Sequence, residues 1–161
     1  MDKKEKVYAF FKDFNIPYTV VNHPAIFSEK DDVEIHTEGE ICKNLFLKDR
    51  HQKEKFYLVC LPLHKRANIK KIEQELGVKK LSFGNEQELL SELNITPGSV
   101  SILNIIEAPN TQVEFLLDEE LKNLEKVCFH PNDNTASISF CSRDLDKILQ
   151  YYHVKYRYIH V

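Results

Sequence analysis

The sequence of 161 residues has no tryptophan, one methionine, four glycines and six prolines. Such low glycine and proline contents exclude collagen-like and linker-like chains, and no segment is compositionally biased. The longest uninterrupted apolar run, residues 56–61, is far shorter than the ~20 residues that cross a bilayer. The first six residues are mostly charged and are not the apolar centre of a signal peptide. We therefore expect a cytoplasmic protein with no membrane segment.

The sequence also lacks the usual signatures of metal, redox and phosphate-loop chemistry. The four cysteines lie far apart, without the two-residue spacing of zinc or thioredoxin-type motifs. There is no glycine-rich phosphate loop, no serine nucleophile elbow and no histidine pair with metal-ligand spacing. We expect buried free thiols, no metal and no cofactor.

Length and composition predict one globular domain spanning residues 1–161, since a domain typically has ~100–200 residues. Apolar residues make up 42% and charged residues 29%, close to the average for soluble proteins. Apolar periodicity predicts a helix capped by Asp2, a short helix opening at Ser28, and a helix after a cap at Ser142. Further helices are predicted over residues 69–76, ending at Gly77, and around residues 89–93 after a cap at Asn85. Strands are predicted over residues 18–22, 43–48, 55–61, 100–106, 112–117, 126–129, 135–140 and 155–161.

The order of these elements predicts an α+β fold with a mixed, mostly antiparallel sheet and helices packed on it. Residues 55–61 are apolar on both faces, which is typical of a central strand. Residues 135–140 alternate between apolar and polar, which predicts one face toward the core and one toward water.

Three residues are candidates for a functional site, and each also has a purely structural interpretation. Lys43 alternates with Leu45 and Leu47, so it either extends out of the strand end or lines a pocket. His130 follows a predicted strand and precedes a proline, which fits a hydrogen-bonded structural residue or a functional one. Gly98, in a Pro-Gly-Ser sequence, fits a tight turn.

The net charge of −3 gives no sign of nucleic-acid binding, but residues 64–80 are locally basic. Two acidic residues, Glu73 and Glu75, accompany six basic ones in this segment. The segment fits either a solvated helix face or a local patch for nucleic acid that the average charge hides. Its basic residues are Lys65, Arg66, Lys70, Lys71, Lys79 and Lys80.

Several strings occur in a familiar order: Asn-His-Pro-Ala at 22–25, Cys-Lys-Asn-Leu-Phe-Leu-Lys-Asp at 42–49, Leu-Ser-Phe-Gly at 81–84, Pro-Gly-Ser-Val at 97–100 and Phe-His-Pro at 129–131. In these strings the chain resembles the YbaK-like aminoacyl-tRNA deacylases, relatives of the editing domain of bacterial prolyl-tRNA synthetase. The resemblance covers nearly the whole chain and is strongest to the free-standing ProX/PrdX branch. It implies a mixed-sheet α+β domain that hydrolyses a mischarged aminoacyl ester, above all Ala-tRNA(Pro).

The resemblance also implies residue roles. The essential lysine falls on Lys43, its neighbouring asparagine on Asn44, and the pocket histidine on His130. The substrate loop falls on Gly98 and Ser99. We expect Val33, Ile35 and Leu47 to line the amino-acid pocket, and Lys65, Arg66, Lys70 and Lys71 to contact the acceptor end of tRNA(Pro). Prolyl-tRNA synthetase is a further expected partner.

Two departures from the family pattern bear on specificity: Ile102 replaces a proline frequent in relatives, and the loop at residues 36–41 is short. The alternatives are a deacylase with another preference, such as Cys-tRNA(Pro), and a non-catalytic tRNA-binding or regulatory module. A Schiff-base enzyme would need a neutral Lys43, against a reference lysine pKa of ~10.4.

Overall fold

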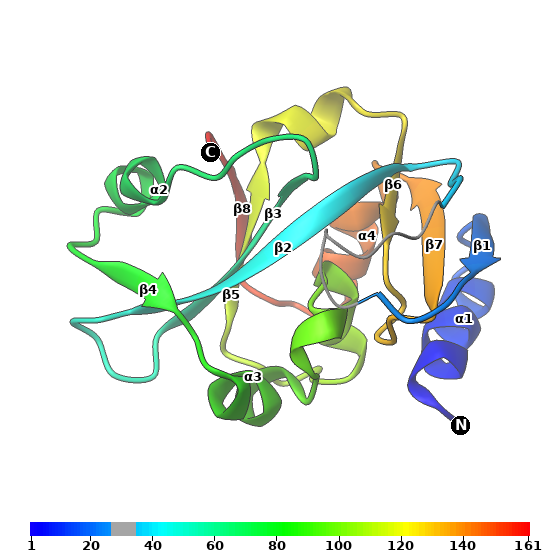
Figure 1. Ribbon diagram of the computed structural model, residues 1–161, viewed down its shortest axis with the longest axis horizontal. Coiled ribbons are helices and arrows are strands. Elements are labelled where there is room, and N and C mark those ends of the chain that lie inside the picture. Colours follow the sequence, from blue (N-terminus) through cyan, green and yellow to red (C-terminus); the bar gives the residue numbers. More distant parts are fainter. Residues whose placement is uncertain (27–34) are drawn as a thin grey trace.

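The computed structural model describes residues 1–26 and 35–161, and the fold is built around one mixed sheet (Figure 1). In the described residues the sheet has eight strands in the order β1-β7-β6-β2-β3-β5-β8, with β4 paired to β2. The strands are β1 (Tyr18–Asn22), β2 (Glu40–Asp49), β3 (Phe56–Pro62), β4 (Leu81–Phe83), β5 (Glu114–Asp118), β6 (Lys126–Phe129), β7 (Ala136–Cys141) and β8 (Tyr156–Ile159). Antiparallel pairs are β1·β7, β7·β6, β2·β3 and β2·β4, and parallel pairs are β6·β2, β3·β5 and β5·β8. The predicted mixed α+β fold is confirmed.

Helices cover both faces of the sheet. One apolar cluster takes side chains from α1, α3 and α4, whereas a second cluster packs α2 through Ile72 against β2, β3 and β5. The α-helices are α1 (Lys3–Asp13), α2 (Ile69–Leu76), α3 (Glu86–Leu93) and α4 (Asp144–Tyr151). Three short 3-10 helices are η1 (Pro97–Ser99), η2 (Ile102–Ile106) and η3 (Glu119–Asn123).

Local sequence signals explain where these helices begin and end. Asp2 and Asn85 each form a capping box. The capping side chain accepts a hydrogen bond from the third helical amide, and the glutamate at that third position accepts one from the backbone amide of the capping residue. Gly77 ends α2 with φ of 69°, a left-handed conformation that glycine adopts without steric cost. These three predictions are confirmed, as is the central position of β3, which is buried along its whole length.

The predicted strand over residues 100–106 is wrong, because this segment forms the 3-10 helix η2. The Ser101 Oγ accepts from the Leu103 amide, and the Asn104 Oδ1 accepts from the Ser101 amide. This reciprocal cap fixes a helical turn, whereas the apolar run alone is typical of an extended strand. Ile102, Leu103 and Ile105 are fully buried on all sides of the turn.

Two further predictions are corrected at the C-terminal end of the chain. Both faces of β7 are buried, since Ser137 and Ser139 are only 4% and 3% exposed. Ser139 Oγ accepts a hydrogen bond from the Gly39 amide, so the buried hydroxyl has a partner within the protein and does not need water. Ser142 does not cap α4: its Oγ donates to the Leu124 carbonyl instead. The short helix predicted from Ser28 lies largely outside the described residues.

Two composition-based expectations can be compared with the described part of the chain. Cys42, Cys60 and Cys128 are buried free thiols, as expected, whereas the free thiol Cys141 is half-buried. None of the helices there combines the length and hydrophobicity needed to cross a bilayer.

Candidate functional site

The sheet divides where β2 leaves β6, and this division places the candidate site. Strand β2 pairs with β6 only through Glu40 and Ile41, the latter opposite Cys128. Beyond this point β2 pairs with β3 on one edge and with β4 on the other, from Leu47 onward. Because β2 and β6 run parallel, Lys43 and His130 each lie two residues beyond the last pair. The parallel register therefore places these two residues at the same level of the sheet.

Lys43 lies on the face of β2 that it shares with Leu45 and Leu47, and it is opposite Leu61 of β3. Its side chain is half-buried. Within residues 1–26 and 35–161 the ammonium group forms neither a hydrogen bond nor an ion pair. The structure thus holds a cation whose donors are free for a ligand.

Asn44 points to the opposite face of β2 and is also unpartnered. Its Oδ1 is buried and lacks a hydrogen-bond partner in the described structure. A buried amide oxygen without a partner costs about 1–3 kcal/mol, so Asn44 Oδ1 can accept from a ligand or a water that enters here. Asn44 lines a hollow of about 380 Å³ together with Leu89, Pro97 and Val100. The hollow therefore joins β2 to both sides of the Gly98 turn.

Two buried amides connect this turn to the loop that carries His130. Asn104 Nδ2 donates to the Ser99 carbonyl at 3.0 Å and to Asn132 Oδ1 at 2.7 Å. Asn132 Nδ2 in turn donates to the Leu103 carbonyl at 3.0 Å. Asn104 is fully buried and Asn132 is 3% exposed, so water does not compete for these bonds. The Gly98 turn and the His130 loop are thus held as one unit.

His130 is oriented by its own loop. Its Nδ1 lies 2.9 Å from the Ala136 carbonyl, so Nδ1 carries the proton and Nε2 remains an acceptor. Burial lowers the pKa of His130, the bond to Ala136 acts in the opposite direction, and nearby His23 lowers it further. The His23 ring packs edge-on against the His130 ring, with 5.8 Å between the ring centroids. The Nε2 of His23 lies 2.9 Å from Ser137 Oγ. The site therefore holds a neutral imidazole.

A family comparison decides what this arrangement belongs to. Residues 33–148, which include Lys43, the Gly98 turn and His130, match the model of the aminoacyl-tRNA editing domain. The chain belongs to the aminoacyl-tRNA editing domain family. The predicted family is confirmed.

Curated and solved relatives of this editing domain span nearly its full length. The prolyl-tRNA editing protein ProX of Acetoanaerobium sticklandii is 32% identical over 152 residues, covering 93% of this chain and 92% of that protein. The prolyl-tRNA synthetase associated domain-containing protein 1 of Danio rerio is 29% identical, and the match covers 93% of this chain and 83% of that protein. A crystal structure described as a candidate trans-editing enzyme for prolyl tRNA synthetase has 18% identity and a TM-score of 0.69. The match covers 100% of this chain and 98% of that chain. This last likeness supports the fold.

The predicted pocket-lining residues of the editing domain do not all gather in one place. Val33 lies outside the described residues. Ile35 lines a separate hollow of about 450 Å³ with Ile41 and Leu63. Leu47 is fully buried in the cluster that packs beneath α2. Their roles in the amino-acid pocket stay predictions.

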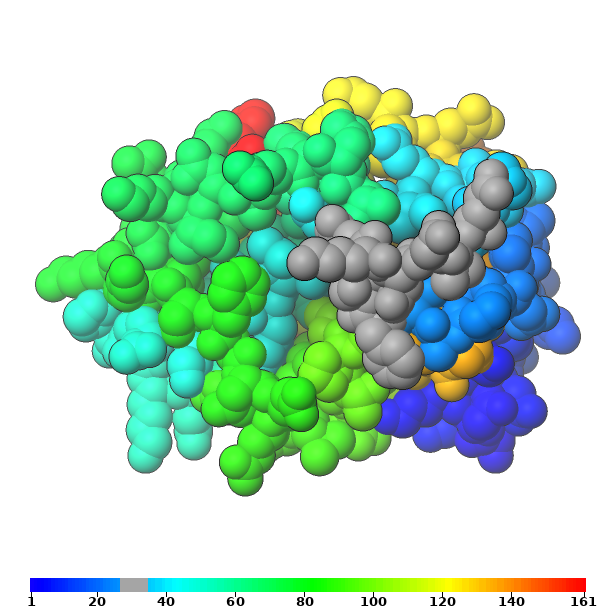
Figure 2. Space-filling view, viewed as in Figure 1, coloured from blue at the N-terminus to red at the C-terminus, as the bar shows by residue number. Residues whose placement is uncertain are grey.

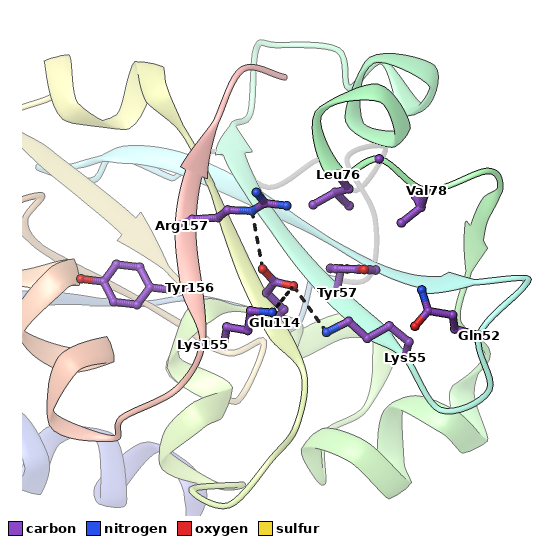
Figure 3. Close-up of a pocket in the computed structure, with 10 residues that line it drawn as sticks. Gln52, Lys55, Tyr57, Leu76, Val78, Glu114, Lys155, Tyr156 and Arg157 are labelled. Atoms are coloured by element: carbon purple, nitrogen blue, oxygen red, sulfur yellow. Dashed lines mark ion pairs between the residues drawn. The ribbon is translucent and has the colours of Figure 1, made fainter.

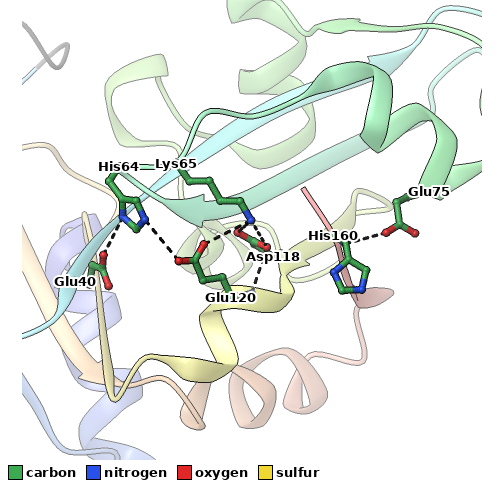
Figure 4. A network of polar contacts seen from close by, with 7 residues as sticks. All are labelled: Glu40, His64, Lys65, Glu75, Asp118, Glu120 and His160. Carbon is green, nitrogen blue, oxygen red and sulfur yellow. Dashed lines mark hydrogen bonds and ion pairs between the residues drawn. The ribbon is translucent and has the colours of Figure 1, made fainter.

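Lys65, predicted to contact tRNA, belongs to an acidic network (Figure 4). Its Nζ lies 2.9 Å from Asp118, whose carboxylate is 1% exposed, and 3.5 Å from Glu120. Burial acts to lower the pKa of Lys65, but its bonds to Asp118 and Glu120 outweigh burial and raise it. His64 bridges Glu40 and Glu120 beside it. The charge of Lys65 is therefore largely balanced within the protein.

The other basic residues of this segment are exposed. Those on and around α2 form no ion pair with any described residue, and their segment occupies the upper left of the surface in Figure 2. On α2 the single buried residue is Ile72, so the lysines lie on its solvent side. These free cations are Arg66, Lys70, Lys71, Lys79 and Lys80.

Sequence reasoning missed three contributors to the site: His23, Asn104 and Asn132. Asn104 carried a signal, since it is a lone amide within the apolar run 102–106. Asn132 has φ of 61°, a conformation that asparagine tolerates better than most residues. Its place after Pro131 was a weaker hint. His23 had no signal beyond the Asn-His-Pro string.

Proposed function

We propose that this protein is a trans-editing aminoacyl-tRNA deacylase that hydrolyses the ester of alanine mischarged onto tRNA(Pro). Membership of the editing-domain family supports the reaction class. The names of the relatives, a prolyl-tRNA editing protein and a prolyl-tRNA synthetase associated protein, support tRNA(Pro) as the substrate. The observation that carries the proposal lies at the division of the sheet. Within the described residues, the Lys43 ammonium and, on the opposite face of β2, the buried Asn44 Oδ1 have no partner.

The chemistry follows from what each group can donate or accept. An aminoacyl ester is already activated, so hydrolysis requires an oriented water and a stabilised oxyanion. The Lys43 ammonium is a donor and a positive charge, so we assign it to the ester carbonyl or the terminal phosphate. As a cation it cannot act as the base, and the ribose hydroxyl of the substrate is the proposed base.

Asn44 and His130 complete the proposed site as acceptors. Asn44 Oδ1 is suited to accept from a hydroxyl or from the attacking water. The neutral His130 offers Nε2 for the same purpose, because its Nδ1 proton is engaged by Ala136. Both groups would orient the reacting atoms without carrying charge into the site.

Specificity is proposed to rest on steric exclusion at the Gly98 turn. Alanine is smaller than proline, so a site that admits alanine must exclude proline by collision with its ring. Attraction alone separates side chains by only ~1–3 kcal/mol per methylene, which makes a separate editing site useful. Prolyl-tRNA synthetase is the proposed partner that releases the mischarged tRNA.

A deacylation panel tests the proposal. Purified protein is mixed with alanyl-, cysteinyl-, seryl- and prolyl-tRNA(Pro), and the surviving ester is measured over time. We expect alanyl-tRNA(Pro) to be hydrolysed fastest and prolyl-tRNA(Pro) to be spared. Faster loss of the cysteinyl ester would reassign the substrate, and hydrolysis of none would leave a non-catalytic tRNA-binding module.

A further inference from the structure

A third hollow lies at the opposite end of β3 from the candidate site. It has a volume of about 490 Å³ and lies among the starts of β3 and β5, strand β8 and the end of α2 (Figure 3). Three cations line it: Lys55 from the turn before β3, and Lys155 and Arg157 from the start of β8. Leu76 and Val78 form the facing wall.

One buried carboxylate organises the three cations. Glu114 is 5% exposed and lies 3.4 Å from Lys55 Nζ, 3.9 Å from Lys155 Nζ and 3.5 Å from Arg157 Nε. The cations are 27%, 72% and 48% exposed, so they stand between Glu114 and solvent. With three positive charges and one negative, these four side chains carry a net charge of +2. An anion entering from solvent meets the cations first.

Most of the donors in this hollow are unused. The ion pair of Arg157 with Glu114 is given by Nε at 3.5 Å, and the two terminal nitrogens of Arg157 donate no hydrogen bond to any described residue. The Tyr57 hydroxyl lines the same hollow, and burial raises the pKa of Tyr57, with Glu114 adding to the effect. A planar guanidinium with free terminal nitrogens matches the oxygens of a phosphate group.

The hollow adjoins the exposed cations of the α2 segment. Leu76, Gly77 and Val78 line it, and Lys79 and Lys80 follow directly in the chain. Lys70 and Lys71 lie at the far end of α2, beyond Glu73 and Glu75, so the free cations next to the hollow are Lys79 and Lys80. Free cations beside a cationic hollow favour a chain of phosphates over one isolated ion.

We propose that the hollow beneath Lys55, Lys155 and Arg157 binds a backbone phosphate of the RNA substrate, as a second anchoring point remote from Lys43. This inference rests on the proposed function for the identity of the RNA. A free mononucleotide carries the same phosphate chemistry, and the experiment separates the two sources.

The test measures binding of an acceptor-stem RNA hairpin by fluorescence anisotropy over a range of salt concentrations. The variant is Lys155→Gln with Arg157→Gln. The matched control is Lys147→Gln, because Lys147 is also 72% exposed and also pairs with a buried carboxylate, Asp144. We expect the double variant to bind roughly fivefold or more weakly near 0.1 M salt, with a shallower salt dependence. The control should bind like the wild type.

A parallel titration with adenosine monophosphate and with inorganic phosphate, followed by the NMR signal of Arg157 Nε, decides the source. No shift at millimolar concentration supports an RNA backbone site. Saturable mononucleotide binding with unchanged RNA affinity overturns the proposal, as does equal RNA binding by all three proteins. Wild-type hydrolysis of alanyl-tRNA is scored separately, so its absence would remove the proposed function without deciding the RNA-binding result.

Discussion

Asn104 donates to Asn132 at 2.7 Å through two side chains that are almost completely buried. Asn104 lies in η2, next to the turn with Gly98, and Asn132 lies in the loop that follows His130. The bond therefore fixes the distance between two parts of the site that are remote in sequence. A buried amide pair of this kind is costly to break, because each partner left alone remains desolvated.

Asn132→Gly should destabilise the protein and loosen the site. Glycine adopts the positive φ of Asn132, so the change removes the amide without straining the backbone. Loss of the bonds to Asn104 and Leu103 should lower the free energy of unfolding by at least about 2 kcal/mol, measured by urea denaturation. Asn15→Gly is the control, since Asn15 has φ of 54° and an exposed side chain. Equal effects of the two changes would mean that the amide network contributes nothing.

Gly98→Val should lower hydrolysis of alanyl-tRNA(Pro) by roughly tenfold or more while leaving the fold intact. Among the described glycines only Gly77 has a positive φ, so the φ angle of Gly98 does not strain a residue with a side chain. The added methyl groups would occupy space beside the hollow shared by Asn44, Pro97 and Val100. Kinetics and a thermal melt are measured on the same preparation. Full activity in a folded variant would remove the Gly98 turn from the alanine site.

His130 should make stability depend on pH. Burial holds its pKa below the ordinary value of about 6.5, so the unfolded chain binds the proton first as the pH falls. The contribution of neutral His130 to the free energy of unfolding is therefore present above pH ~6.5 and is lost as the pH falls toward the folded-state pKa. His130→Gln should flatten the decline in unfolding free energy between about pH 7 and 5. The exposed His51→Gln is the control, and an unchanged slope in His130→Gln would contradict a buried neutral imidazole.

Charge reversal on α2 should weaken RNA binding. Lys70 and Lys71 are exposed and unpaired in the described structure, so Lys70→Glu with Lys71→Glu removes free positive charge without disturbing the core. We expect a higher KM for alanyl-tRNA(Pro), an unchanged kcat and a shallower salt dependence of binding. Lys12→Glu with Lys147→Glu reverses two charges on other helices as a control. An equal loss in both double variants would indicate a general charge effect instead of a docking surface.

Much of the fold could be predicted from the sequence because its signals are local. Capping residues such as Asp2 and Asn85, and the continuous apolar character of β3, act within a few residues. Residues 100–106 could not be predicted in this way, because the cap between Ser101 and Asn104 competes with an apolar run that fits a strand equally well. The buried polar face of β7 depends on hydroxyl partners such as Gly39 from a distant segment.

The candidate site was predicted from family strings, and its connections were not. Lys43, Asn44, Gly98 and His130 were named from their motifs. The Asn104–Asn132 bond depends on contacts between segments 28 residues apart, which no local pattern reveals. The same is true of Lys65, whose charge is balanced by Asp118 at the end of β5, the strand next to β3.

The central claim is that Lys43 supplies the charge for ester hydrolysis. The most direct measurement is the single-turnover rate on alanyl-tRNA(Pro) for the wild type and for Lys43→Ala, with circular dichroism to check the fold. Lys48→Ala is the control, since it removes another lysine of β2, one that pairs with Glu88 at 3.1 Å. We expect Lys43→Ala to fold normally and to retain less than about a tenth of the wild-type rate, because it loses the cation that would stabilise the oxyanion. A folded Lys43→Ala protein that hydrolyses the ester at the wild-type rate would contradict the account.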